Sequence, residues 1–240
     1  MKKQTVNSMI SYFKFVSTLI LLLGTSFIQA QMEVTQAMTP TQYVNNVLLG
    51  EGVTATNVQF TGSLEQIGYL TDGVGFSIEN GIIMSTDLAT NPATCDGAAG
   101  CGGCGGAGDP DLLTVANSVP PLIGQTFNVQ SVNDVCILEF DFQPSGDFVS
   151  FNYVFGSDEY LGWVNSQYND IFAFFLSGPG ISGPYASPAG FPDGAINIAQ
   201  VPDSDPPLPV TISSVNDVTN PEYYIDNPGA VDQPCINGYT

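Results

Sequence analysis

Alternation of apolar and polar residues is the main pattern along this chain. The clearest run is residues 136–142, where every second side chain is apolar and Glu139 and Asp141 face the other way, the period of a half-buried β-strand. Residues 149–155 alternate in the same way after a turn at residues 144–147. We therefore expect these two runs to pair as a β-hairpin.

Other apolar runs predict further short strands. Residues 171–176 are apolar on both faces and predict a central strand that is covered on each side. One short helix is predicted near the N-terminus, capped by Thr39, opened by Pro40 and ended by Gly50. The remaining predicted strands are residues 54–60, 81–85, 196–199 and 210–213. The pattern indicates an all-β fold, a jelly-roll-like two-sheet antiparallel sandwich with one short N-terminal helix.

Residues 1–30 have the pattern of a secretory signal peptide. Lys2, Lys3 and Lys14 supply the positive end, and the apolar run that follows is about 14 residues long, shorter than the ~20 needed to span a membrane. We expect a single β-sandwich domain over residues 31–240, exported to the extracellular space or the cell surface. Residues 237–240 resemble a turn that enters a strand, so we expect a truncated domain whose anchor lies in a further C-terminal segment.

Charge narrows the functions that this domain can have. After residue 30 the chain carries 23 carboxylates and no Lys, Arg or His, a formal charge of −23. Binding to nucleic acids or to anionic membranes is excluded, because both need cationic side chains. Catalysis by Ser-His-Asp or Cys-His and metal ligation by His are excluded for the same reason. Clustered carboxylates are left with solvation, a shifted pKa, or a hard cation such as Ca²⁺.

The densest polar cluster lies between residues 149–155 and residues 171–176. Strands that neighbour each other bring their ends to one sheet edge, and Ca²⁺ takes six to eight oxygen ligands of the kinds found here. Loop acids that are simply solvated are the alternative. The predicted Ca²⁺ ligands are Asp158, Glu159, Asn169 and Asp170.

A carbohydrate-binding or carbohydrate-active domain is the alternative from another class. Asp158 and Glu159 carry the two carboxylates of a glycosidase acid and nucleophile. Neighbours in sequence rarely face each other across the required ~5 to 9 Å, so one partner would come from Asp170 or Asp226. Residues 223–227 place two tyrosines beside Asp and Asn, as in sugar-binding sites, although core tyrosines at a strand end are the commoner cause. The only tryptophan suits a core cap as well as a ligand contact.

Five cysteines add a question of redox chemistry. Three of them lie in the Gly-rich stretch of residues 95–106, which has no following Lys and so cannot be a phosphate loop. Zinc ligation and disulfide bonding are both open, and an oxidising compartment favours disulfides. The odd number leaves one thiol free or paired outside the domain. The cysteines are Cys95, Cys101, Cys104, Cys136 and Cys235.

Taken together, these residues resemble the choice-of-anchor L domain of bacterial surface and secreted proteins. The resemblance covers about residues 39–240, and the Ser-Asp/Glu-Glu-Tyr and Asn-Asp motifs of that family fall on residues 157–160 and 169–170. It implies a β-rich module of long exported proteins with alternative sorting or anchoring signals, including those of type IX secretion and gliding. We expect a non-catalytic adhesion or gliding module whose partners are surface glycans or other surface proteins. The stretches that carry the resemblance are residues 48–53, 138–142, 151–160, 164–179 and 223–227.

Overall fold

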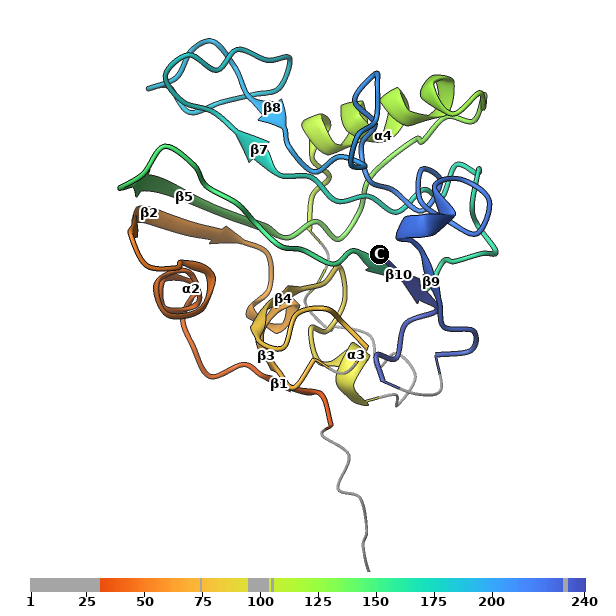
Figure 1. Ribbon diagram of the computed structural model, residues 1–240, viewed down its shortest axis with the longest axis horizontal. Coiled ribbons are helices and arrows are strands. Elements are labelled where there is room, and N and C mark those ends of the chain that lie inside the picture. Colours follow the sequence, from red (N-terminus) through yellow and green to blue (C-terminus); the bar gives the residue numbers. More distant parts are fainter. Residues whose placement is uncertain (1–30, 74, 95–103, 105, 231–232) are drawn as a thin grey trace, which may run out of the picture. The chain divides into compact units, whose positions relative to one another are not determined.

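The longest strands form a two-stranded antiparallel ribbon. In the computed structural model, which describes residues 31–73, 75–94, 104, 106–230 and 233–240, β2 (Val53–Thr61) pairs with β5 (Ile137–Pro144) (Figure 1). Their register shifts between Thr56 and Gln59, where Asn57 adopts a φ of 53°. Side chains along both strands alternate between half-buried and exposed, and no residue of either strand is fully buried. The ribbon is therefore held mainly by its ladder of backbone hydrogen bonds.

A second sheet carries part of the core. Its order is β1 (Glu33–Thr35), β3 (Ile67–Thr71) and β4 (Gly81–Met84), with both pairs antiparallel. The central strand buries Ile67 and Leu70. Gly68 lies so close to β1 that an added Cβ would come within 2.5 Å of Val34 Cγ1. Only glycine allows the two strands to approach in this way.

The predicted N-terminal helix is confirmed. α2 (Pro40–Tyr43) continues into the π-helical turn η1 (Val44–Leu48), and Tyr43 and Val44 are buried. Thr39 is the N-cap: its hydroxyl accepts the backbone N–H of Gln42, and the Gln42 side chain accepts the backbone N–H of Thr39. This reciprocal capping box satisfies two backbone donors that a helix start leaves without partners. The 3₁₀ turn η2 (Leu64–Gln66) is capped by Ser63 in the same way.

The prediction of only one helix is wrong. α4 (Pro110–Leu122) has 13 residues, is capped by Asp109 and buries Val115 and Val119. Its sequence hides it, because Pro120 and Pro121 stand in the last turn, where proline normally marks a helix end. A further short helix, α3, spans Asn91–Thr94. No helix in the described part of the chain is long and apolar enough to cross a membrane.

The predicted hairpin of residues 136–142 with residues 149–155 is also wrong. β5 pairs with β2, and residues 149–155 form no ladder. They pack through aromatic rings instead: Phe151 lies 6.5 Å from Phe142 and 5.4 Å from Phe174, between ring centroids. The alternation that predicted a strand therefore describes a buried face without the hydrogen bonds of a sheet.

The predicted central strand over residues 171–176 is reduced to its end. Only β7 (Phe175–Leu176) is a strand, paired with β8 (Ile196–Asn197), and Ile171 makes one bridge to Thr211. The described strands form four small antiparallel sheets of two or three strands. The mostly-β class is thus confirmed, whereas the two broad sheets of a sandwich are not.

The last sheet places the acidic residues. β10 (Gly238–Tyr239) lies between β6 (Gly156–Ser157) and β9 (Ile225–Asp226) (Figure 1). β9 follows the 3₁₀ turn η3 (Pro221–Tyr223) in the sequence. A hydrophobic core lies beside it, and its buried members are Val119, Phe155, Tyr160, Val201, Leu208, Val210, Ile212 and Val215. The polar cluster of residues 158–170 begins directly after β6.

Residues 211–216 cross this core as an irregular but fully buried segment, here called the polar turn. Thr211, Ser213, Ser214 and Asn216 are each at most 1% exposed. The Asn216 amide donates to the carbonyls of Ile212 and Ser213 at 2.9 and 3.1 Å and accepts two further backbone N–H groups. Ser214 Oγ donates to the carbonyl of Pro209 at 2.6 Å. In this segment, side-chain hydrogen bonds satisfy the buried backbone groups that a sheet ladder satisfies elsewhere.

Candidate functional site

Ser157 links the two halves of the polar cluster. Its side chain is buried at the end of β6, and its hydroxyl donates to Asp170 Oδ2 at 2.6 Å. The same oxygen accepts the backbone N–H of Glu159 at 2.9 Å. Segments 13 residues apart in the sequence are thereby joined, although the predicted strands over residues 149–155 and 171–176 do not form the sheet edge that was expected to join them.

Asp158 is supported by the end of the described chain. The backbone N–H of Asn237 donates to Asp158 Oδ1 at 3.2 Å, and the Asn237 side chain donates to the carbonyl of Asp158 at 2.6 Å. Pairing of Gly238 with Ser157 in the β6–β10 ladder brings this asparagine into place. The sequence carries no local signal for the contact, because the partners lie 79 residues apart.

Asn169 faces the polar turn. It is 5% exposed, and its side-chain oxygen accepts the backbone N–H of Ser213 at 3.3 Å. Next to it, the carbonyl of Asp170 accepts the backbone N–H of Ile212 at 3.2 Å. The backbone N–H of Asn165 donates to Ser213 Oγ at 2.9 Å. Of the four predicted ligands, Asp158, Asn169 and Asp170 thus each have a side-chain oxygen that already accepts a hydrogen bond.

The three carboxylates Asp158, Glu159 and Asp170 lie close enough to affect one another, and we call them the acidic cluster. Burial raises the pKa of Asp170, the hydrogen bond from Ser157 lowers it, and the charge of Asp158 raises it further. Asp170 as a residue is exposed, but its carboxylate is surrounded by protein atoms, and these surroundings set the pKa. Burial and the charge of Asp170 raise the pKa of Glu159. Burial also raises the pKa of Asp158, against the hydrogen bond from Asn237.

Three buried polar atoms around the acidic cluster have no hydrogen-bond partner among the described residues. They are Glu159 Oε2, Tyr160 Oη and Asn169 Nδ2. Tyr160 is 5% exposed, and burial, Tyr224 and Asp170 together raise the pKa of its hydroxyl. A buried polar atom without a partner costs about 1–3 kcal/mol, so the cluster gains from a ligand that supplies one.

The donor chemistry of the acidic cluster is that of a hard-cation site. All donors are oxygen, and no Lys, Arg or His of residues 31–240 can neutralise them. Among the residues that the structure describes, however, no group of three or more His, Cys, Asp or Glu side chains is arranged to hold a metal ion. A bound cation would therefore take part of its ligand set from backbone carbonyls and water.

Aromatic side chains lie on the surface beside the acidic cluster. Trp163 and Tyr168 are 49% and 52% exposed, and their rings meet edge to face with centroids 4.9 Å apart. Leu161 is 41% exposed in the same loop. The structure thus places the only tryptophan at the surface and not over the core. We call Leu161, Trp163 and Tyr168 the aromatic patch.

The tyrosines of residues 223–227 have another role. Both Tyr223 and Tyr224 are half-buried and pack against the hydrophobic core. The ring of Tyr224 lies 4.8 Å from that of Tyr160, and its hydroxyl donates to Asp226 Oδ1 at 3.0 Å. Packing against the core is therefore their main contribution, as the commoner interpretation of this segment expects.

The described cysteines differ in state. Cys104 and Cys235 are disulfide-bonded, whereas Cys136 is a free thiol that donates to the carbonyl of Ser85. Burial raises the pKa of Cys136 to about 11, which disfavours the thiolate that zinc would need. Cys95 and Cys101 lie outside the described residues, as does the predicted signal peptide.

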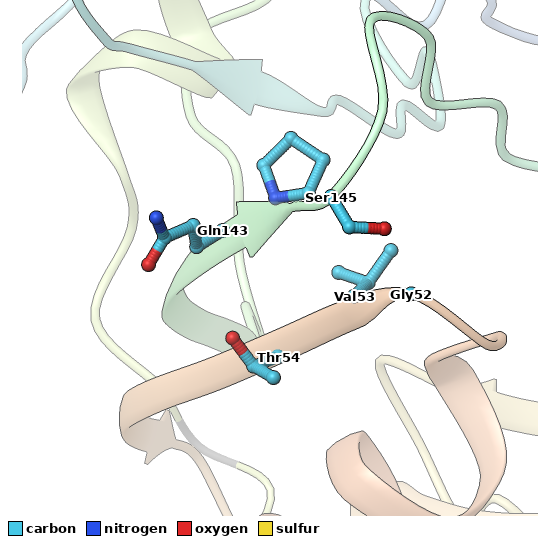
Figure 2. Close-up of a pocket in the computed structure, with 6 residues that line it drawn as sticks. Gly52, Val53, Thr54, Gln143 and Ser145 are labelled. Carbon is cyan, nitrogen blue, oxygen red and sulfur yellow. The ribbon is translucent and has the colours of Figure 1, made fainter.

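A pocket of about 290 Å³ lies away from the acidic cluster, where β2 begins and β5 ends. Figure 2 shows its lining residues on the adjacent ends of the two strands. Here Ser145 donates its backbone N–H to the carbonyl of Gly52 at 2.8 Å. None of its lining residues ionises, so it offers neither an acid nor a base for catalysis. They are Gly52, Val53, Thr54, Gln143, Pro144 and Ser145.

Fold and site together define a mostly-β module with an acidic, aromatic surface and without cationic side chains. The chain belongs to the Choice-of-anchor L domain family, whose family model matches residues 31–240. This membership indicates a surface-associated, exported module and confirms the resemblance seen in the sequence. No curated protein and no solved structure matches the chain.

Proposed function

We propose that this domain is a non-catalytic adhesion module of the cell surface, in a protein that serves attachment or gliding. The observation that carries the proposal is that the exposed aromatic patch and the acidic cluster occupy one short stretch, residues 158–170. Exposed aromatic side chains are enriched where proteins bind one another. Family membership supports the location at the surface.

Adhesion is tested by coupling residues 31–240 to beads and measuring bead retention under flow on surfaces coated with cells or surface polymers. Beads carrying the domain should be retained longer than beads carrying an inert protein of equal negative charge. Equal retention of both kinds of bead contradicts the adhesion function.

Calcium is the second part of the proposal. Ca²⁺ at the acidic cluster would offset the mutual repulsion of Asp158, Glu159 and Asp170 and give Glu159 Oε2 a partner. Asn169 would contribute indirectly, by fixing the chain before Asp170 against the polar turn. The metal would stiffen the loop that carries the aromatic patch.

A melting experiment tests the calcium part. An ion that binds only the folded state at 100 times its Kd stabilises by about 2.7 kcal/mol, or roughly 5–11 °C for a domain of this size. Residues 31–240 should melt higher in millimolar Ca²⁺ than in chelator. The difference should vanish in Asp170→Asn and persist in Asp147→Asn, which removes an exposed acid after β5. Superimposed melts of the unmodified domain in the two buffers contradict calcium binding.

A carbohydrate-active domain is the second candidate. The observation that favours it is the raised pKa of Glu159, which a glycosidase acid requires. Glu159→Gln and Asp158→Asn should then abolish activity on a polysaccharide panel while leaving the fold intact. If the unmodified domain hydrolyses none of the polysaccharides, the carbohydrate-active function is contradicted and adhesion is the function that remains.

A further inference from the structure

The loop of the aromatic patch is held on both sides. Its first turn is closed by the backbone N–H of Trp163, which donates to the carbonyl of Glu159 at 3.1 Å. Further along, the backbone N–H of Asn165 is bound by Ser213, and Ser166 Oγ accepts the backbone N–H of Tyr168 at 3.1 Å. The exposed rings are therefore presented in a fixed arrangement, which lowers the entropy lost when a partner binds.

The acidic cluster flanks the aromatic patch in the sequence. Glu159 lies two residues before Leu161, and Asp170 lies two residues after Tyr168. Asp170 is anchored by Ser157, and Glu159 Oε2 is buried without a hydrogen-bond partner among the described residues. Next to these carboxylates, the 95% buried Tyr160 has a hydroxyl that lacks a partner. Exposed aromatic rings and acidic residues thus occupy one short stretch of the chain.

Charge selects the occupant of this surface. Residues 31–240 carry a formal charge of −23 with no cationic side chain, so an anionic polymer or a second copy of the domain would be repelled. A positively charged group is attracted by the negative charge of the whole domain and by the nearby carboxylates. It also binds the faces of Trp and Tyr rings through cation–π interactions. Lys and Arg side chains satisfy all three conditions.

We propose that the aromatic patch, with Glu159 and Asp170, is a docking site for Lys and Arg side chains of a basic segment on a partner protein. This rests on the proposed adhesion function and names the chemistry of its partner. The ammonium or guanidinium group lies against Trp163 and is attracted by the negative charges of Glu159 and Asp170. Leu161 packs against the aliphatic stem of the bound side chain.

Trp163 makes the test direct, because it is the only tryptophan of the chain and its fluorescence reports on the patch alone. Residues 31–240 are titrated in chelator with an acetylated Lys/Arg-rich peptide, its Glu-substituted counterpart and a neutral oligosaccharide. The basic peptide should change the emission of Trp163 with saturation, and the affinity should fall at 1 M salt. The other two ligands should leave the emission unchanged.

Matched variants separate a site from a diffuse negative field. Glu159→Gln and Asp147→Asn each remove one charge, and Tyr168→Ala and Phe148→Ala each remove one exposed ring; Phe148 is 84% exposed and follows Asp147 outside the patch. Glu159→Gln and Tyr168→Ala should each weaken binding about threefold to tenfold. The two control variants should change it less than twofold. Calorimetric titration of Trp163→Leu supplies the same comparison without fluorescence, and thermal melts confirm that every variant is folded.

Equal weakening by Glu159→Gln and Asp147→Asn would overturn the proposal, because binding would then come from net charge alone. An emission change with the neutral oligosaccharide but not with the basic peptide would overturn it in favour of glycan binding. Since the titration contains chelator, its outcome is independent of calcium. Bead retention that persists while basic peptides fail to bind separates failure of this proposal from failure of the adhesion function.

Discussion

The β2–β5 ribbon and the polar turn hold the chain in opposite ways. The ribbon has the longest regular ladder of the described residues and buries no side chain completely, whereas the polar turn has no ladder and buries nearly every side chain. In the first, backbone groups satisfy one another at little cost in burial; in the second, Thr, Ser and Asn side chains satisfy the backbone inside the core. Regular secondary structure is therefore a poor guide to where the stability of this domain lies.

The site belongs to the second region. Asn169, Asp170 and Asn165 all bond to Ile212 or Ser213 of the polar turn. A loop attached to a deeply buried segment keeps its geometry at the surface. The four predictions below measure this difference, starting with the largest effect on stability.

Truncating a core side chain should separate the regions most clearly. Ile212 is fully buried in the polar turn, so Ile212→Ala should cost about 2–5 kcal/mol of unfolding free energy through lost burial and a cavity. Ile137→Ala, at a half-buried position of β5, is the matched control and should cost less than half as much. Urea denaturation measures both. Equal losses would show that the ribbon is as tightly packed as the core.

Removing a side-chain amide should also destabilise the polar turn more than the ribbon, by a smaller margin in unfolding free energy. Asn216→Ala removes the partner of two buried carbonyls and of two partly buried N–H groups and should cost about 2–4 kcal/mol. In the ribbon, Asn57 donates one exposed hydrogen bond to Asp141 and has positive φ, which glycine tolerates. Asn57→Gly should cost less than about 1 kcal/mol. A larger loss for Asn57→Gly in the same urea experiment would contradict the contrast.

The acidic cluster should give the domain a pH-dependent stability. Its carboxyl pKa values are raised on folding, so the folded state binds more protons than the unfolded state between the two sets of values. Unfolding free energy should therefore fall as pH rises from about 4 through the raised values. Melting temperatures in chelator measure this, and Asp170→Asn should flatten the dependence whereas Asp147→Asn should not. A stability that rises with pH across this range would refute the assignment.

The smallest change is expected at the tip that follows the ribbon. Phe148 is 84% exposed, and Phe148→Ser should alter the free energy of unfolding by no more than about 0.5 kcal/mol. Phe155→Ser, a buried counterpart in the core, should be strongly destabilising by comparison. If the two variants melted together, Phe148 would have to be packed in solution.

Local signals account for what could be predicted. The helix that starts at Pro40 was predictable because Thr39 and Gln42 form its cap within four residues. The partner of β5 was not, because alternation reports a buried face and not the strand, about 80 residues away, that pairs with it. α4 begins with the readable signal of Asp109 and Pro110, but prolines in its last turn break the helical pattern.

For the site, too, contacts between residues close in the sequence could be predicted, and contacts between distant residues could not. Acidic residues beside the ends of two predicted strands were sufficient to expect Asp158, Glu159 and Asp170 near one another. The Ser157 hydroxyl bonds to Asp170 and to the backbone of Glu159. Nothing local marks Asn237 as a support of Asp158, because that contact depends on the β6–β10 pairing. Whether the cluster binds calcium stays a prediction that the melts described above decide.

The β6–β10 pairing also sets an order of events during synthesis. Thr240 donates its backbone N–H to Phe155 and accepts one from it, so residues 155–158 find their partners only after residue 240 has been made. A chain that emerges from its N-terminus must keep the site open until this last stretch appears, since contacts of such long range form late. The site can therefore reach its final geometry only once residues 237–240 are available to pair with residues 155–158.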